Sequence, residues 1–137
     1  LTAWLLCIAA LVSLATSFAA PEIGVRVIAH PSVSVAEISA EDLKSIFLLT
    51  KTTLNGSHVE PVLDTGVLRL FSGAYLGKTD QGLEIYYRSR IFAGKGSMPA
   101  RFVSGADVVS HVARTPGAIG YVGENTQLAG VKTLRVR

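Results

Sequence analysis

The chain has very little cysteine: its single one, Cys7, lies in an apolar stretch at the amino terminus. A lipid-modified cysteine would follow small residues, and Leu5 and Leu6 are not small, which argues against lipidation. No cysteine follows Cys7. The rest of the chain therefore uses neither disulfides nor thiolate chemistry, and its stability must come from a hydrophobic core.

Motifs for metal or nucleophilic chemistry are also missing. The three histidines, His30, His58 and His111, stand far apart and lack the spacing of metal ligands. There is no Gly-x-Ser-x-Gly elbow, and residues 94–97 (GKGS) follow a predicted helix, whereas a phosphate loop precedes one. We therefore expect a non-catalytic protein with no metal and no cofactor.

Charge is sparse and scattered. Thirteen Lys and Arg against ten Asp and Glu leave a formal net charge of +3 and a pI near 9.3. Only Arg88, Arg90 and Lys95 lie close together, and a nucleic-acid footprint would be denser, so we expect no nucleic-acid partner. A weakly positive field suits a small anion or a membrane surface.

Residues 1–20 contain no charged side chain. A membrane-spanning helix needs roughly 20 apolar residues, but Ser and Thr interrupt this run after residue 12. Residues 17–19 (Ser-Phe-Ala) fit the small-x-small pattern of a signal-peptidase site. We interpret residues 1–19 as a cleaved secretory signal, with an uncleaved anchor as the alternative. Residues 20–137 then form one periplasmic or secreted domain without a permanent membrane anchor.

Hydrophobic periodicity after residue 20 alternates between strand and helix patterns. The order is strand, helix, strand, three helices, strand, strand, which is typical of an α/β sandwich with a small sheet. The strands are predicted at residues 24–30, 59–63, 118–122 and 131–136, and the helices begin at Ser39, Val67, Thr79 and Ser104. Pro61 indicates that the second strand is an edge strand or that the proline stands at its start.

Two of these helices begin with the spacing of a capping box, in which Ser39 precedes Asp42 and Ser104 precedes Asp107 by three residues. The helical period also predicts which side chains are buried. The expected stripes are Leu43, Ile46 and Phe47 in the first helix and Val67, Leu70, Phe71 and Ala74 in the second. We further expect Phe47, Val109 and Ile119 to share one core.

Asp64, Thr65 and Gly66 lie between a predicted strand and a predicted helix. Free N–H groups and the positive dipole end of a helix start favour an anion there. Arg69 follows one turn later and could reach back. The alternative is an ordinary helix N-cap at Asp64 or Thr65. Asp64 would repel an anion unless it accepted a hydrogen bond from a protonated ligand oxygen.

Residues 115–122 (TPGAIGYV) resemble the hallmark turn and strand of phosphate ABC-transporter substrate-binding proteins. Residues 39–48 (SAEDLKSIFL), residues 91–96 (IFAGKG) and the helix beginning at Ser104 are similar to further stretches of that family, in the same order. The similarity covers most of residues 24–123. It implies one lobe of a type 2 periplasmic-binding-protein-like α/β fold, with a small mixed sheet flanked by helices.

The resemblance implies non-catalytic periplasmic binding of phosphate or another small oxyanion, in a role related to phosphate ABC transport. Asp64, Thr65, Gly66 and Arg69 would form the remnant ligand site. The family's loop of the Arg-Ser-Asp-Gly-Ser-Gly-Thr-Thr type reads LDTGVL here, at residues 63–68, so its arginine and hydroxyl cluster are missing. The alternative function is a ligand-free interaction module that docks on a sensor or another envelope protein.

If residues 1–19 are a signal, the exported protein should begin at or close to Ala20, because cleavage follows the small residue of the site. N-terminal sequencing of the periplasmic fraction tests this expectation. Recovery of residues 1–15 in the membrane fraction would contradict it.

Overall fold

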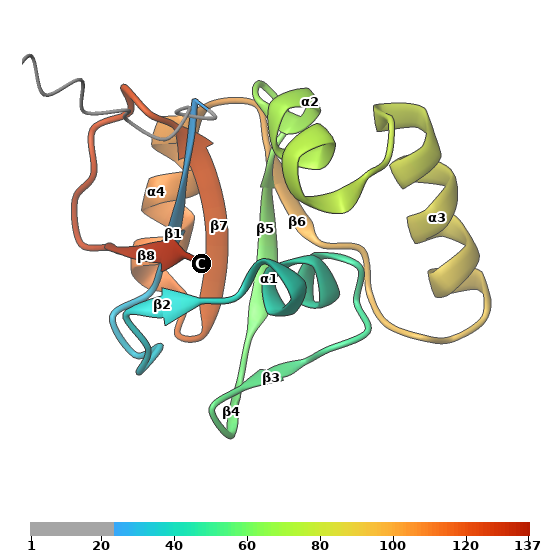
Figure 1. Cartoon of the computed structure of the whole chain (residues 1–137), viewed down its shortest axis with the longest axis horizontal. Coiled ribbons are helices and arrows are strands. Elements are labelled where there is room, and N and C mark those ends of the chain that lie inside the picture. Colours follow the sequence, from blue (N-terminus) through green and yellow to red (C-terminus); the bar gives the residue numbers. More distant parts are fainter. Residues whose placement is uncertain (1–23) are drawn as a thin grey trace, which may run out of the picture.

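The computed structural model describes residues 24–137 as a mixed sheet of six strands with helices on both faces (Figure 1). The predicted signal segment lies outside these residues. The sheet strands are β1 (Val25–Ala29), β2 (Glu37–Ile38), β5 (Glu60–Asp64), β6 (Ala100–Phe102), β7 (Ala118–Gly123) and β8 (Lys132–Val136). A separate hairpin joins β3 (Thr53–Leu54) to β4 (Ser57–His58). The helices are α1 (Ala40–Phe47), α2 (Leu68–Phe71), the π-helical η1 (Ser72–Leu76), α3 (Asp80–Phe92) and α4 (Gly105–Arg114).

The strand order is β2-β8-β1-β7-β5-β6, which confirms the predicted α/β class with a mixed sheet. β1 runs antiparallel to β7 and β8, while β5 runs parallel to both β6 and β7. The carboxyl ends of β5, β6 and β7 therefore lie at one edge. β2, β3, β4 and β6 were not predicted, because strands of two or three residues leave no readable alternation.

Pro61 stands at the second position of β5, so the prediction of a strand start is right and the edge alternative is wrong. β5 lies inside the sheet, between β7 and β6. A proline is tolerated there because the pairing with β6 begins only at Val62, opposite Ala100. The N–H that Pro61 lacks has no ladder partner on that side.

Capping at the helix starts follows the prediction. The Ser39 hydroxyl accepts a hydrogen bond from the Asp42 N–H at 3.1 Å, and the Ser104 hydroxyl accepts one from Asp107 at 3.3 Å. Thr79 caps α3 in the same way through the Gly82 N–H. These side chains satisfy N–H groups that a helix start leaves without a partner, and they fix where each helix begins.

An aromatic cluster forms the core on the face covered by α1, α2 and η1. The rings of Phe71 and Tyr121 stack with centroids 3.9 Å apart, and the Phe47 ring meets Phe71 edge-on at 4.7 Å. Leu43, Ile46 and Phe47 are all fully buried, as the helical period predicts. The Tyr121 hydroxyl donates to the backbone carbonyl of Asp64 at 3.0 Å. The cluster thus connects α1 and η1 to the end of β5.

The opposite face of the sheet carries a second core under α4. Val108, Val109 and Val112 of α4 pack there against Ile28 and Val122. The expectation that Val109 shares a core with Phe47 and Ile119 is therefore wrong. Side chains alternate along β7, so Ile119 faces the aromatic cluster while Val122 faces α4.

The buried face of the second predicted helix also differs from the expected one. Phe71 is buried, but Leu70 is half exposed and Ala74 is exposed. After Phe71 the helix widens into a π turn, in which the Gly77 N–H donates to the carbonyl of Ser72, five residues back. The wider turn shifts the residues that follow Ser72 around the helix axis, which moves Ala74 out of the expected stripe. Leu70 precedes this turn, and Ser72 is buried at its start.

Three side chains of α3 hold the carboxyl end of α1. They donate to three successive backbone carbonyls there, which a helix end leaves without partners. The bonds run from Tyr87 to Phe47 (2.7 Å), from Tyr86 to Leu48 (2.6 Å) and from Arg90 to Leu49 (2.8 Å). Burial raises the pKa of Tyr87 well above its usual value, so its hydroxyl remains a donor. Within residues 24–137, no helix is long and apolar enough to cross a membrane.

Replacing Phe47 with Ala should lower the free energy of unfolding by about 3–5 kcal/mol, because the ring is fully buried against Phe71 and Tyr121. Denaturant titration of both proteins measures the change. Phe92→Ala is the matched control: Phe92 is 95% exposed, and its removal should change stability by less than about 0.5 kcal/mol. A loss below roughly 1 kcal/mol for Phe47→Ala would contradict the packing of the core.

Candidate anion-binding site

Three loops meet at the carboxyl ends of β5, β6 and β7. The loop after β5 is bound to the end of β6, because both the N–H and the hydroxyl of Thr65 donate to the carbonyl of Phe102, at 2.9 and 3.2 Å. A Cβ at Gly66 would lie 3.0 Å from the carbonyl oxygen of Val103. Glycine therefore lets these two loops approach closely.

The loop after β7 completes this edge through Thr126. A Cβ at Gly105 would lie 2.8 Å from the Thr126 hydroxyl oxygen and 3.4 Å from Oδ2 of Asp64. Gly105, the first residue of α4, is thus enclosed between the threonine and the carboxyl group. Because Gly105 has no side chain, the start of α4 can lie close to the Asp64 carboxyl group.

Asp64 is the most enclosed polar group of this edge, with 3% of its surface exposed. Its Oδ1 accepts a hydrogen bond from the Gly66 N–H at 2.9 Å, which closes a turn of the backbone. Burial raises the pKa of Asp64, although hydrogen bonds from the backbone of Gly66 and Val67 oppose the shift. The carboxyl group is therefore held in one position and is harder to ionise than an exposed aspartate.

Neither Asp64 nor Thr65 caps α2, so the alternative of an ordinary N-cap is wrong. Val67 occupies the N-cap position, and no side chain accepts from the helix start. α2 itself has only four residues before the π turn, whereas α4 has ten. The helix start beside the Asp64 carboxyl group is that of α4, where the dipole favours negative charge.

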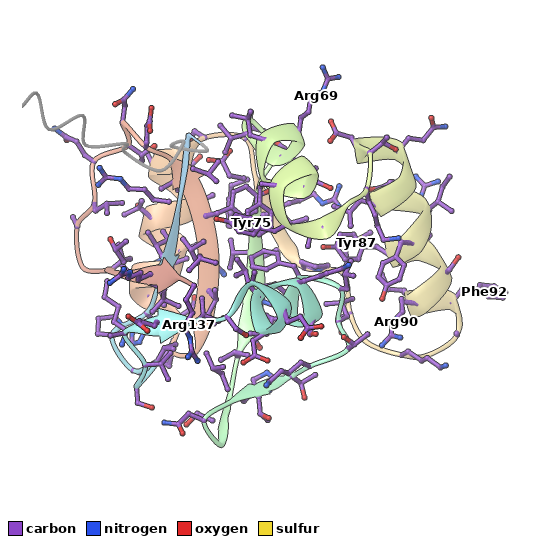
Figure 2. The ribbon with its side chains drawn as sticks, in the orientation of Figure 1. Arg69, Tyr75, Tyr87, Arg90, Phe92 and Arg137 are labelled. Atoms are coloured by element: carbon purple, nitrogen blue, oxygen red, sulfur yellow. The ribbon has the colours of Figure 1, made fainter. Side chains whose placement is uncertain are left out.

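The four predicted site residues are only partly brought together. Asp64, Thr65 and Gly66 lie in one turn, but Arg69 is exposed and projects outward from α2 (Figure 2). Among residues 24–137, the side-chain hydrogen bonds of the turn join Thr65 to Phe102 and Gly66 to Asp64, and none of them involves Arg69.

Three residues of the edge were missed by the sequence analysis as site residues: Ser104, Gly105 and Thr126. Ser104 was identified as a helix cap, but nothing in a capping box indicates that the helix starts beside Asp64. The start of α4 lies beside Asp64 because β6, a short strand between α3 and α4, runs parallel to β5 and ends opposite Asp64. Thr126 carried no sequence signal.

A groove of about 590 Å³ lies at the opposite edge, near the amino ends of β5 and β6. Its lining includes Lys95 and Ser97, together with His58, Glu60 and His111. The GKGS stretch is therefore remote from Asp64 and cannot contribute to the same site. Within residues 24–137, no three His, Cys, Asp or Glu side chains form a group that could hold a metal ion.

If burial disfavours the charged form of Asp64, the unfolded chain loses this proton at lower pH than the folded protein. The free energy of unfolding should then fall as the pH rises from about 3.8, the ordinary value, through the raised pKa of Asp64. Asp64→Asn keeps an acceptor for Gly66 but cannot ionise, so its stability relative to wild type should increase across that window. Denaturant titrations of both proteins over this pH range measure the difference. If the difference in unfolding free energy between the two proteins does not change with pH, or changes in the opposite direction, the pKa of Asp64 is not raised by burial.

No family model and no curated protein matches the chain. Several solved structures match its fold over 82–83% of its length. One is an ABC-type phosphate transport receptor from Vibrio cholerae (14% identity, TM-score 0.53). Others are a phosphate ABC transporter substrate-binding protein with bound phosphate from Clostridium perfringens (18%, 0.55) and PstS from Borrelia burgdorferi (20%, 0.58). The chain covers 46%, 44% and 47% of these three proteins, respectively. The domain therefore has the fold of a part, less than half, of the phosphate-receptor chains.

Proposed function

We propose that this domain binds a small oxyanion bearing a proton, with hydrogenphosphate as the first candidate, and that it performs no catalysis. The observation that carries the proposal is the enclosed carboxyl group of Asp64 beside the start of α4. It lies at the carboxyl ends of parallel strands, on a fold shared with phosphate receptors. We place the protein in the periplasm or outside the cell, after cleavage of residues 1–19.

The chemistry of the edge suits a protonated oxyanion. An ionised carboxylate only accepts hydrogen bonds, so Asp64 repels a fully deprotonated anion but can accept from a P–OH group. The Asp107 N–H already donates to the Ser104 hydroxyl, but the N–H groups of Gly105 and Ala106 have no partner inside the helix and can donate to the remaining oxygens. Together these groups select a ligand that is both a donor and an acceptor.

Binding at this edge should be weak. One layer of loops contacts the ligand, and water competes for each remaining oxygen, where the high dielectric weakens every charged contact. Arg69, the only arginine of the predicted set, projects away from the turn. A dissociation constant on the order of a millimolar follows for the isolated domain.

The interaction module remains a second candidate, and a specific observation favours it. The Thr65 hydroxyl and Oδ1 of Asp64 are already hydrogen-bonded within the protein. Val103, whose carbonyl lies against Gly66, is 81% exposed, and Leu70 of the following helix α2 is 50% exposed. A sensor or another envelope protein that covers these side chains would need no phosphate.

Isothermal titration of the protein with phosphate distinguishes the two candidates. We expect millimolar binding, and Thr65→Ala should weaken it at least about fivefold, because the hydroxyl both contacts the ligand and holds the turn against β6. Thr65→Ser keeps the hydroxyl and should retain most of the affinity. Thr133→Ala, at an exposed position of β8, is the matched control and should bind like wild type.

Two outcomes would overturn the proposal. Submicromolar binding that is insensitive to Thr65→Ala would mean that the site lies elsewhere, and the groove containing Lys95 and Ser97 would be tested next. No binding at several millimolar phosphate would favour the interaction module.

A further inference from the structure

The outer face of α3 displays large apolar side chains to solvent. Phe92 is 95% exposed and Ile85 is 58% exposed. Seven residues separate them, so both lie on the same face of the helix. Figure 2 shows Phe92 pointing away from the domain at the end of α3. Contiguous exposed apolar surface, in contrast to scattered single residues, marks an interaction site, and these two side chains share one helix face.

Basic residues accompany these apolar ones. Residues 85–98 contain Arg88, Arg90 and Lys95 and no acidic residue, but Arg90 donates inward to the carbonyl of Leu49, so Arg88 and Lys95 are the outward charges. The nearest carboxylate is Glu84, which is 3.6 Å from Arg88 and 3.2 Å from Arg101. One acid therefore pairs with two arginines, so this part of the chain keeps a net positive charge.

The size and charge of the surface decide which partner it fits. Two copies of the same basic face would repel each other, which disfavours self-association. A stable protein interface buries about 800 Å² on each side, whereas one phenyl side chain supplies only about 150–250 Å². A lipid bilayer needs less: an apolar side chain enters the interface while Lys and Arg contact anionic headgroups.

We propose that the end of α3 docks on an anionic lipid surface, with Phe92 and Ile85 entering the interface and Arg88 and Lys95 contacting the headgroups. This inference is independent of phosphate binding, because none of these side chains belongs to the Asp64 edge. The inference gives α3 a role beyond packing. Among the described residues, α3 is the longest helix on the face of the sheet that carries the aromatic cluster.

The test uses the full chain with a polarity-sensitive fluorophore at Ser89→Cys in a Cys7→Ser background, which leaves one labelling site. Ser89 is exposed and lies between Ile85 and Phe92 on the helix. Phosphatidylcholine vesicles with about one-third phosphatidylglycerol should shift the emission to the blue more than pure phosphatidylcholine does, and about 0.5 M salt should abolish the difference. Residues 1–20 carry no charge, so their own affinity for lipid should be similar for the two kinds of vesicle.

Variants and a second label show whether α3 itself makes the contact. Phe92→Ser should reduce the anionic-specific shift at least about threefold, and so should the pair Arg88→Gln and Lys95→Gln. Val103→Ser removes another exposed apolar residue, 81% exposed, and should change nothing. A fluorophore at Ser110→Cys on α4 should show no anionic-specific shift. An unchanged unfolding midpoint for Phe92→Ser establishes that a lost shift is not a loss of fold.

Three results would overturn the proposal. Equal shifts at Ser89 and Ser110 would indicate unspecific adsorption. An anionic-specific shift that survives Phe92→Ser would separate the ring from the contact. A shift without lipid that grows with protein concentration would show that a second copy covers the ring.

Discussion

One side chain, Tyr121, connects the core of this domain to its candidate site. Its ring stacks on Phe71 and lies against Phe47, while its hydroxyl donates to the backbone carbonyl of Asp64. The same residue thus fixes how α1 and α2 pack on the sheet and where β5 ends. Burial raises the pKa of Tyr121 far above its usual value, so the hydroxyl remains a donor under all ordinary conditions. The turn after β5 is consequently held by the best-packed part of the molecule, even though a turn at a sheet edge is normally among the least constrained segments.

α3 is attached in a different way, and the difference explains its exposed face. Leu83 and Tyr87 are its only fully buried side chains, and its firmest contacts are the hydrogen bonds from Tyr86, Tyr87 and Arg90 to the end of α1. Polar bonds of this kind fix the position of a helix without covering its outer surface. The apolar residues of that surface, Ile85 and Phe92, therefore contribute little to the fold and remain available for the proposed contact with lipid.

Local chemistry made part of this structure predictable. Ser39 and Ser104 mark helix starts because a hydroxyl three residues before an acid satisfies a free N–H, whatever the rest of the fold does. Ala74 was wrongly expected to be buried because it lies in the π turn, which the regular helical period does not encode. Val109 was assigned to the wrong core for a related reason: periodicity tells which side of a helix is buried, but not which face of the sheet it covers. The sequence indicated only the turn at Asp64 as part of the candidate site. The rest of the candidate site is positioned by β6, a strand of three residues that is too short to predict.

The burial of Asp64 links ligand, proton and stability at this edge. When Asp64 is ionised, one carboxylate oxygen accepts from the Gly66 N–H, and the other can still accept a hydrogen bond. Asp64 is almost fully buried, so little water is present to donate that bond. A ligand with a hydroxyl group, such as the P–OH of hydrogenphosphate, can donate this bond. It would then stabilise the ionised form of Asp64, which burial alone disfavours. By linkage, such a ligand must lower the pKa of Asp64 as it binds, and it must stabilise the folded protein most at the pH where the empty site is least stable. Under the proposed function, a sulfate-like anion without a proton would gain nothing from this coupling, and the cost of burying the Asp64 carboxylate would discriminate among oxyanions.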